Sequence, residues 1–436
     1  MRFRWWKFGN AHLPLSFAAL IFAGTLLLLL PGVLESGEMS LIDAVFTACS
    51  AVCLNGLSVI PAHEFSFAGQ FILLVLIQLG CFGILSLSAM ILLLLGRGLS
   101  FSNTLVMYNL NDRFSRACTE SLVRTVVGYT LISEAVGFVL MLPGFLFRGI
   151  GFWESVWYSL FYSIGSFCNA GIGPLAGDIA EAGRYVQVIS IALIIFGGIG
   201  VYVIYDLLEM LRNRRHRLRL HSRIVLTATS VLLVAGTLVL WSTSMLPSAE
   251  TLTFWDALYL SASSRTAGYT PVDIGLLPQA TVIIIMVLML VGGSPGGAAG
   301  GVKTTALAVV FAALISSFKG DREVIIGNRS IDWRIVLRAF TIVVIFLLFS
   351  LSGSLILNAL FPHKDSLRSA FEVVSALSGT GLSMGGFTRE LNSAGKLFII
   401  FFMFIGRVGP LSIILFFVGR EKPGHLRYPH ERVIIG

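Results

Sequence analysis

Eight long apolar stretches dominate this chain and limit what it can fold into. A helix needs about 20 apolar residues to cross the roughly 30 Å hydrocarbon core of a bilayer. The stretches that meet this length are residues 13–33, 71–96, 125–147, 185–205, 224–246, 279–318, 339–361 and 397–419. Only 12% of the 436 residues are charged, whereas soluble domains carry about 25%. The sequence therefore predicts an integral membrane protein.

The sixth stretch, residues 279–318, is about twice the length that one span requires. Its middle holds a run of ten small residues that includes six glycines and a proline. Glycine and proline are the poorest helix formers, so we expect the helix to break here. The run consists of Gly292, Gly293, Ser294, Pro295, Gly296, Gly297, Ala298, Ala299, Gly300 and Gly301.

The basic residues indicate how the spans are oriented. If the N-terminus is cytoplasmic, most of the 31 Lys and Arg residues fall in cytoplasmic connections or tails. Positive residues favour the cytoplasmic side, so we expect both termini inside a cell membrane. The same distribution accounts for the net charge of +8 without a nucleic-acid partner. The basic run 212–223 is expected to lie near anionic membrane lipid.

The outer connections share a repeated pattern. Each contains a semi-apolar segment of about 12 residues, too short to span a bilayer, that ends in a glycine. A second glycine follows 24 to 26 residues after the first. The first glycines are Gly56, Gly171, Gly268 and Gly381, and the second are Gly80, Gly197, Gly292 and Gly406. The pattern predicts four copies of one structural unit.

Each unit is expected to consist of a span, a short helix that enters the membrane and returns, and a second span. A re-entrant loop is tolerated only where protein buries it or water lines it. Four such loops around one axis would turn helix C-termini and backbone carbonyls toward the centre, as in potassium filters. We therefore predict an all-α membrane fold with eight transmembrane helices around a pseudo-fourfold pore. The alternative is four outer caps without a pore. The predicted divisions are 1–97, 98–212, 213–320, 321–419 and a tail at 420–436.

Several motifs resemble those of the Trk/Ktr family of potassium-transporter membrane subunits, most closely the Ktr type. They are Ser264-Arg265-Thr266-Ala267-Gly268-Tyr269, the glycine-rich run continued through Val302-Lys303-Thr304, and Phe404-Ile405-Gly406-Arg407-Val408-Gly409-Pro410. The resemblance covers nearly the whole chain. It implies potassium uptake through a selectivity filter, a homodimer in a bacterial plasma membrane, and a cytoplasmic ring of nucleotide-binding regulatory subunits as partner.

The resemblance also implies roles for particular residues. Potassium would bind at the filter residues Asn55, Gly56, Ala170, Gly171, Ala267, Gly268, Thr380 and Gly381. The run 292–301 would form an intramembrane gate, together with Lys303 and Arg407. No covalent cofactor is expected, and sodium is a candidate activator. The first loop departs from the family pattern at Cys53-Leu54-Asn55, so the ring is expected to be less regular in that quarter and less strict in its selectivity.

Five charged residues lie at or near membrane depth, where an unpaired charge is costly. Arg407 is expected to hold the gate loop or line the pore, with a structural ion pair as the alternative. Lys303 is expected either to anchor the loop or to extend to the inner surface. Arg265 and Glu372 either support the filter from behind or face the outer vestibule, and we favour the vestibule for Glu372. Glu134 is expected to be a satisfied interhelical residue.

Two other functional classes were weighed against potassium uptake. A secondary cotransporter with weak potassium selectivity would use broken helices and inverted repeats, whereas these four loops enter from one side. A membrane enzyme would need a convergent set of titratable groups, which the charged residues at depth do not form. The sequence also approaches a nucleotide-binding P-loop near Lys303, but Val302 interrupts the required spacing.

Overall fold

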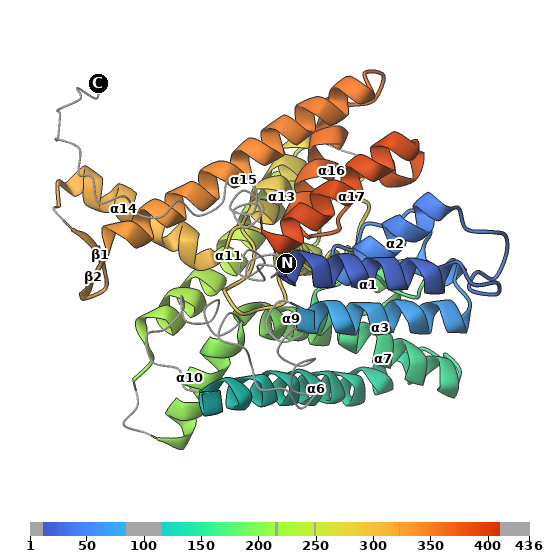
Figure 1. Cartoon of the computed structure of the whole chain (residues 1–436), viewed down its shortest axis with the longest axis horizontal. Helices are drawn as coiled ribbons and strands as arrows, with labels where there is room; N and C mark the ends of the chain where they lie inside the picture. The colour runs from blue at the N-terminus through green and yellow to red at the C-terminus, as the bar shows by residue number, and fades with distance from the viewer. Residues whose placement is uncertain (1–11, 84–115, 214–216, 248–249, 322, 410–436) are drawn as a thin grey trace, which may run out of the picture.

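The computed structural model describes residues 12–83, 116–213, 217–247, 250–321 and 323–409, and this part of the chain is overwhelmingly helical (Figure 1). The helices are α1 His12–Leu28, α2 Leu41–Cys53, α3 Phe67–Gly83, α6 Arg116–Leu146, α7 Phe152–Cys168, α8 Asp178–Ala182, α9 Arg184–Ile199, α10 Val201–Arg212, α11 Leu220–Ser244, α12 Phe254–Ser263, α13 Gln279–Leu290, α14 Thr304–Lys319, α15 Trp333–Leu360, α16 Ser366–Ser378 and α17 Ser393–Val408. A small hairpin pairs β1 Val324–Ile326 with β2 Arg329–Ile331 in antiparallel register.

Three of the described helices are long and apolar enough to cross a membrane alone: α6 over Thr125–Leu146, α11 and α15. The pair α9 and α10 passes the same test if it is counted as one span. Shorter apolar helices include α1, α3, α13 and α14. Residues 84–96 and 410–419 of two expected spans lie outside the described residues. The count of eight spans therefore stays a prediction.

Two of the expected spans are broken, although the sequence led us to expect one break. The anticipated break separates α13 from α14 at the glycine-rich run. The other occurs at Gly200, where α9 ends and α10 leaves at 98° to it. The expectation of one continuous span over 185–205 is wrong. Gly200 adopts φ +88°, which only glycine accepts without strain.

The helices form four similar sets of three, in which the middle helix, called here the short helix, precedes one of the four repeated glycines. The sets are α1-α2-α3, α6-α7-α9, α11-α12-α13 and α15-α16-α17. In each set, the last helix also packs against the short helix of the next set: α3 on α7, α9 on α12, α13 on α16, and α17 on α2. The final contact returns to the first set, so the four sets close into a circle.

The second glycine of each repeat has a packing role. A Cβ atom on Gly80, Gly197 or Gly406 would collide with a backbone carbonyl oxygen of Val52, Phe167 or Leu377, respectively. Each of these carbonyls lies in the last turn of the short helix of the same set. Glycine lets the two backbones touch, which explains the spacing seen in the sequence. In the third set the span is broken, and Gly292 instead faces the carbonyl of Gly300.

Neighbouring glycines in α9 provide a stability test of this packing. We expect Gly197→Ala to lower the melting temperature of the purified protein by about 3 °C or more, because overpacking costs roughly 1–3 kcal/mol. A Cβ on Gly198 would meet nothing within 4 Å. Gly198→Ala should therefore leave the melting temperature unchanged or raise it, since alanine favours helix. Equal destabilisation by both changes would refute the packing role.

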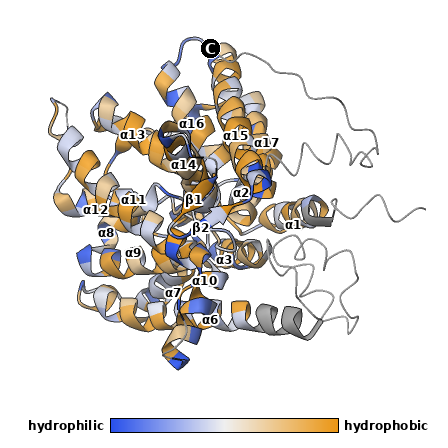
Figure 2. Cartoon of the chain, turned by 90° about the vertical axis from the view of Figure 1, so that its left-hand side faces the viewer, coloured by the Kyte–Doolittle hydropathy of each residue, from blue (hydrophilic) through white to orange (hydrophobic). Residues whose placement is uncertain are grey.

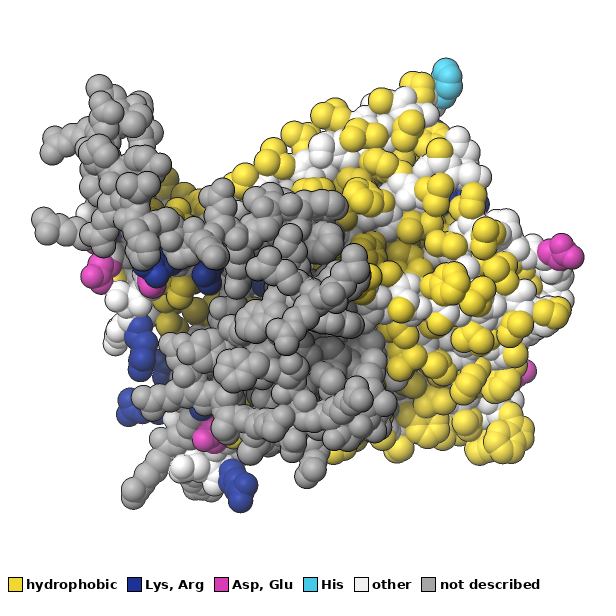
Figure 3. All heavy atoms as spheres, viewed as in Figure 1, with side chains coloured by type: hydrophobic (Ala, Val, Ile, Leu, Met, Phe, Trp, Pro, Cys, Tyr) yellow, Lys and Arg dark blue, Asp and Glu magenta, His cyan; other side chains and the backbone are white. Residues whose placement is uncertain are grey.

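The molecular surface has apolar and basic regions at different ends. Large apolar side chains are exposed along most long helices, including Phe22 of α1, Ile132 of α6 and Leu351 of α15. Figure 2 shows this apolar character around the helices. Lys and Arg side chains gather at the left-hand end in Figure 3, near α10 and the β hairpin of Figure 1. Such a surface suits a lipid environment with one basic aqueous face.

Candidate functional site

The four glycines that end the short re-entrant segments lie together at the centre of the circle. All four have positive φ angles: 95° at Gly56, 65° at Gly171, 79° at Gly268 and 86° at Gly381. This conformation strains any residue with a Cβ atom and turns the neighbouring carbonyls in a direction that ordinary strands do not allow. Their shared backbone geometry therefore requires glycine at all four positions.

These glycines contact one another in cyclic order. A Cβ atom on Gly56 would lie 2.9 Å from the carbonyl oxygen of Ala170, and one on Gly171 would lie 2.7 Å from that of Ala267. The same construction on Gly268 collides with the carbonyl of Thr380, and on Gly381 with that of Asn55. Each loop thus abuts the residue just before the glycine of the next loop. The structure brings together all eight residues expected at the filter, and we call this closed set of contacts the ring.

Three of the four short helices end three residues before their glycine, each with a residue in the left-handed conformation. These residues are Leu54 (φ 53°), Asn169 (φ 56°) and Gly379 (φ 69°). The third short helix, α12, ends five residues before Gly268, and Thr266 takes an unusual φ of 148°. A helix C-terminus carries partial negative charge. Four such ends therefore point their negative poles at the ring.

The first loop departs from the motif expected of the Trk/Ktr family in residue type, but its backbone resembles that of the second loop of this chain. Leu54 has nearly the same φ as Asn169 in the second loop. The fully buried Asn55 side chain donates from Nδ2 to the carbonyl of Ala376 at 2.8 Å. This bond ties the first loop to α16 of the fourth set. Gly56 is held by its own helix, since its N–H donates to Ser50 Oγ at 3.1 Å.

The glycine-rich run between α13 and α14 forms a folded loop that is fastened to the break in the α9–α10 pair. Ser294 N donates to Gly198 O at 3.0 Å, and Ala298 N donates to Gly197 O at 3.1 Å. Ser294 Oγ also donates to the carbonyl of Ile199. The two breaks therefore satisfy each other's free backbone groups, as buried polar groups require.

The same loop packs against the end of a short helix beside the ring. A Cβ on Gly300 would collide with the carbonyl of Ser378, the last residue of α16. The ends of the loop are joined by two further bonds, from Gly292 N to Val302 O at 2.9 Å and from Val302 N to Leu290 O at 3.1 Å. The loop is thus ordered, and it contacts α16 at Ser378, three residues before Gly381.

Two cations hold this loop by its carbonyls. Arg407 of α17 donates to Ala298 O at 2.6 Å and to Gly80 O of α3 at 2.8 Å. Lys303 donates from Nζ to Ala299 O at 2.6 Å. Among the described residues Arg407 makes no salt bridge, so the expected alternative of a structural ion pair finds no support there. Arg407 instead connects α17, α3 and the loop through one guanidinium.

The other three charged residues expected at or near membrane depth, Glu372, Arg265 and Glu134, are also buried. Glu372 has no exposed surface and contacts the hydroxyls of Ser383 and Thr388. Our preference for an exposed Glu372 is therefore wrong, because the loop after Gly381 folds over it. Arg265 is also buried and donates to Thr229 O at 3.2 Å. Glu134 accepts a bond from Gln78 at 3.2 Å, as expected of an interhelical residue.

Asp178, which the sequence analysis did not single out, braces two adjacent loops outside the ring. Tyr162 of α7 donates its hydroxyl to Asp178 Oδ1 at 3.3 Å, and the backbone of Thr270 donates to the same carboxyl. Asp178 itself adopts φ +51°. Nearby, the hydroxyl of Tyr269 donates to Ile172 O at 2.9 Å. The loops after Gly171 and Gly268 are thereby joined to each other.

The buried carboxyl of Asp178 leads us to expect that cation binding depends on external pH. Burial raises the pKa of its carboxyl to about 7, against the hydrogen bond from Tyr162, and the other titratable groups around it are Tyr259 and Tyr269. The carboxyl gains its negative charge as external pH rises through about 7. The negative charge attracts cations, so a cation near the ring should bind more tightly as the pH rises. Asp178→Asn should abolish this rise in a cation-binding titration, and an unchanged pH profile would contradict the assignment.

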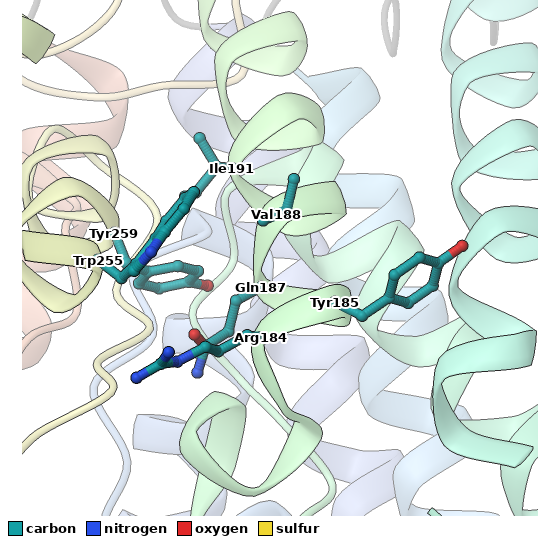
Figure 4. Close-up of a pocket in the computed structure, with 7 residues that line it drawn as sticks. All are labelled: Arg184, Tyr185, Gln187, Val188, Ile191, Trp255 and Tyr259. Atoms are coloured by element: carbon teal, nitrogen blue, oxygen red, sulfur yellow. The ribbon is translucent and has the colours of Figure 1, made fainter. Parts of the chain in front are cut away.

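A groove of about 240 Å³ lies between α9 and α12 (Figure 4). Trp255 and Tyr259 lie side by side in it, whereas Tyr185 points away. The hydroxyl of Tyr259 is 3.0 Å from that of Ser190, which is 2.8 Å from that of Ser166 in α7. These three hydroxyls link α12 to α9 and α7.

Comparison with known proteins places this architecture in one family. The family model described as TrkH, cation transport protein, matches residues 8–423. The chain is similar to Ktr system potassium uptake protein B of Vibrio alginolyticus, with 33% identity covering 97% of this chain and 94% of that protein. It is also 32% identical to potassium/sodium uptake protein NtpJ of Enterococcus hirae, covering 96% and 95%.

A solved structure shows the same fold. The chain superposes on the potassium transporter TrkH from Vibrio parahaemolyticus with a TM-score of 0.73 and 18% identity, covering 94% of this chain and 84% of that one. The Trk/Ktr resemblance inferred from the sequence motifs is confirmed by the family match and by the Ktr relatives. This chain belongs to the TrkH family of cation transport proteins.

Proposed function

We propose that the protein takes up potassium across the cell membrane through the ring of four glycines. The observation that carries the proposal is the closed cycle of contacts in which each glycine abuts the next loop's carbonyl. The potassium ions would be held by backbone carbonyls of Asn55, Gly56, Ala170, Gly171, Ala267, Gly268, Thr380 and Gly381. Carbonyl rings replace the hydration shell of an ion, and the four helix C-termini add favourable negative potential.

The loop 292–301 is the gate in this proposal. It has little side-chain bulk, contacts the end of α16, and is fastened by Arg407 and Lys303. Because the loop is held by hydrogen bonds rather than by a packed apolar face, it can change conformation at modest cost. Opening would release the contacts to Ala298 and Ala299 and move the loop aside.

The Ktr relatives support a proposal for the membrane arrangement and the partners. We propose a multi-pass protein of a bacterial plasma membrane with both termini cytoplasmic and with the four repeats 1–97, 98–212, 213–320 and 321–419, followed by the tail 420–436. The Ktr relatives are named as parts of a potassium uptake system. A homodimer with a cytoplasmic nucleotide-binding regulatory ring fits that role. Sodium remains a candidate activator or second cargo, as the name of the Enterococcus relative suggests.

A second candidate function is a cation-coupled secondary transporter with weak potassium selectivity. The observation that favours it is the presence of two broken spans, at Gly200 and at 291–303, since discontinuous helices are typical of such transporters. The two functions differ in energetics. Coupled transport accumulates substrate against its gradient when a sodium or proton gradient is imposed, whereas a channel-like filter follows the potassium gradient alone.

Growth of a cell that lacks its own potassium uptake systems tests the proposal. Expression of this chain, with a Ktr regulatory subunit supplied, should restore growth at submillimolar potassium. Replacement of Gly268 by alanine should prevent the rescue, because the added Cβ meets the carbonyl of Thr380. Normal growth of the Gly268→Ala strain, with the protein present in the membrane, would remove the ring from the transport route.

A further inference from the structure

Helix α10 differs from the other helices that follow a membrane span. It begins directly after Gly200 and runs at 98° to α9. The 16 residues of α9 rise about 24 Å from the outer surface, against a hydrocarbon core of about 30 Å. The turn therefore occurs near the cytoplasmic boundary of the bilayer. With α9 crossing the membrane, α10 runs along that boundary rather than away from it.

The burial of α10 changes along its length. Val201, Val203 and Ile204 near its start are buried against the rest of the molecule. Further along the face that Val201 and Ile204 begin, at intervals of four and seven residues from them, Tyr205 (45%), Leu208 (53%) and Leu211 (75%) are exposed. These three residues follow one another at three-residue intervals and so form one apolar strip. An amphipathic helix with an exposed apolar strip at this depth suits the boundary between lipid headgroups and acyl chains.

Basic residues follow the apolar strip directly. The segment from Arg212 to Arg223 contains six arginines and two histidines. Arg219 pairs with Asp206 and Glu209, which fastens the start of α11 to α10. Arg212 and Arg217 are exposed. The cytoplasmic leaflet carries negative surface potential, and each basic residue near it strengthens binding by about fivefold.

The first turn of α10 is joined to the proposed gate loop. Val201 N donates to Gly296 O at 3.2 Å. A Cβ on Gly200 would lie 2.6 Å from the carbonyl of Pro295, and one on Gly296 would lie 3.0 Å from the ring of Tyr202. No flexible linker separates helix from loop. A displacement of α10 must therefore change the contacts of the loop.

We propose that α10 is a binding surface for anionic phospholipid headgroups of the cytoplasmic leaflet, and that bound lipid sets the position of the gate loop. The strip of Tyr205, Leu208 and Leu211 enters the acyl boundary while Arg212 and Arg217 contact the phosphates. The effect on the loop rests on the proposed function of that loop, and the choice of leaflet rests on the proposed membrane topology. Lipid fits better than a protein partner because the strip follows the end of α9 near the bilayer boundary and basic residues come directly after it in the sequence.

Proteolysis tests the binding independently of transport. The purified full chain is reconstituted in vesicles of phosphatidylcholine alone or with roughly 30% phosphatidylglycerol, and trypsin is added outside. In the molecules whose cytoplasmic face points out of the vesicle, cleavage within 212–219 should be at least about tenfold slower in the anionic vesicles. Cleavage at Arg329 in the β hairpin provides the internal reference. Equal cleavage rates at 212–219 in both vesicles, relative to that reference, would overturn the proposal.

Matched variants separate the strip from general surface effects. The double change Leu208→Ser and Leu211→Ser leaves every trypsin site in place and should reduce the protection to less than about twofold. Phe318→Ser, which alters an 89% exposed side chain near the basic end of α14, should retain full protection. Protection that survives the double change, or that Phe318→Ser removes equally, would contradict the assignment to α10.

Rubidium flux in the same vesicles then tests the link to the loop. Wild-type flux should differ by about fivefold or more between the two lipid compositions, and Arg212→Gln with Arg217→Gln should reduce that difference below twofold. Lipid-independent flux of the wild type would overturn the effect on the loop. If the arginine changes abolish only the response to an added regulatory subunit, the surface is a protein site and the lipid proposal fails. Absence of flux under every condition would refute the proposed function, while the proteolysis result would still decide lipid binding.

Discussion

Replacing Gly381 by serine is expected to lower selectivity for potassium over sodium by about tenfold or more. The residue adopts φ +86°, and a Cβ there collides with the carbonyl of Asn55 in the neighbouring loop. Left-handed backbone alone costs a residue with a Cβ about 1–2 kcal/mol, and every 1.4 kcal/mol is a factor of ten. The collision adds to this cost and must open the ring. An opened ring is less able to replace the hydration shell of potassium and to distinguish potassium from sodium by size.

A second glycine provides a matched control for that substitution. Gly32 adopts φ +84°, almost the angle of Gly381, but a Cβ there meets nothing within 4 Å. Gly32→Ser carries the same backbone strain without contact to the ring, so its potassium-to-sodium ratio should equal that of the wild type. Measurement of both cation fluxes in reconstituted vesicles separates the two cases. Equal selectivity in both variants would show that the ring contact does not discriminate ions.

Replacing Arg407 by glutamine is expected to raise potassium flux in the absence of any regulatory partner by about tenfold. The guanidinium of α17 contacts the loop at Ala298 and α3 at Gly80 at the same time. Hydrogen bonds to charged groups contribute about 1.5–3 kcal/mol each, so loss of one shifts a closed loop toward open by roughly a factor of ten. Steady-state rubidium uptake by the subunit alone measures this change.

Lysine at the same position distinguishes charge from geometry. Arg407→Lys keeps the positive charge but cannot span two carbonyls with a planar fork. We expect its flux to lie near that of Arg407→Gln if the two-point connection closes the gate. Flux near the wild-type value would mean that charge alone suffices. A fall in flux for both variants would contradict the view that Arg407 holds the loop closed.

Much of the architecture follows from local sequence physics. Helix length, the glycine spacing and the small residues at 292–301 each reflect a constraint that acts within one repeat. Those features predicted the short helices, the ring glycines and the break between α13 and α14. The spacing of the second glycines is a regularity of the sequence. Its reason in three of the four repeats, contact with the last turn of the short helix at Val52, Phe167 or Leu377, needs the folded arrangement.

Other features depended on contacts between repeats and were missed. The break at Gly200 exists because its neighbours bond to the glycine-rich loop about 95 residues away, from Ser294 to Gly198 and from Val201 to Gly296. The cluster Gly197-Gly198-Ile199-Gly200 could have suggested it. Burial of Glu372 results from the outer loop at Ser383 and Thr388 folding over it. No sequence pattern near Asp178 predicts its hydrogen bond to Tyr162, because that bond depends on where α7 lies in the folded protein.

The most direct test of the central claim is cation uptake by the purified chain in liposomes, with a Ktr regulatory subunit added. Rubidium and sodium uptake are measured side by side for the wild type, Gly381→Ser and Gly32→Ser. The account predicts uptake that prefers rubidium in the wild type and in Gly32→Ser, with the preference lost in Gly381→Ser. Equal uptake of both ions by the wild type, or no uptake of either, would contradict potassium permeation through the glycine ring.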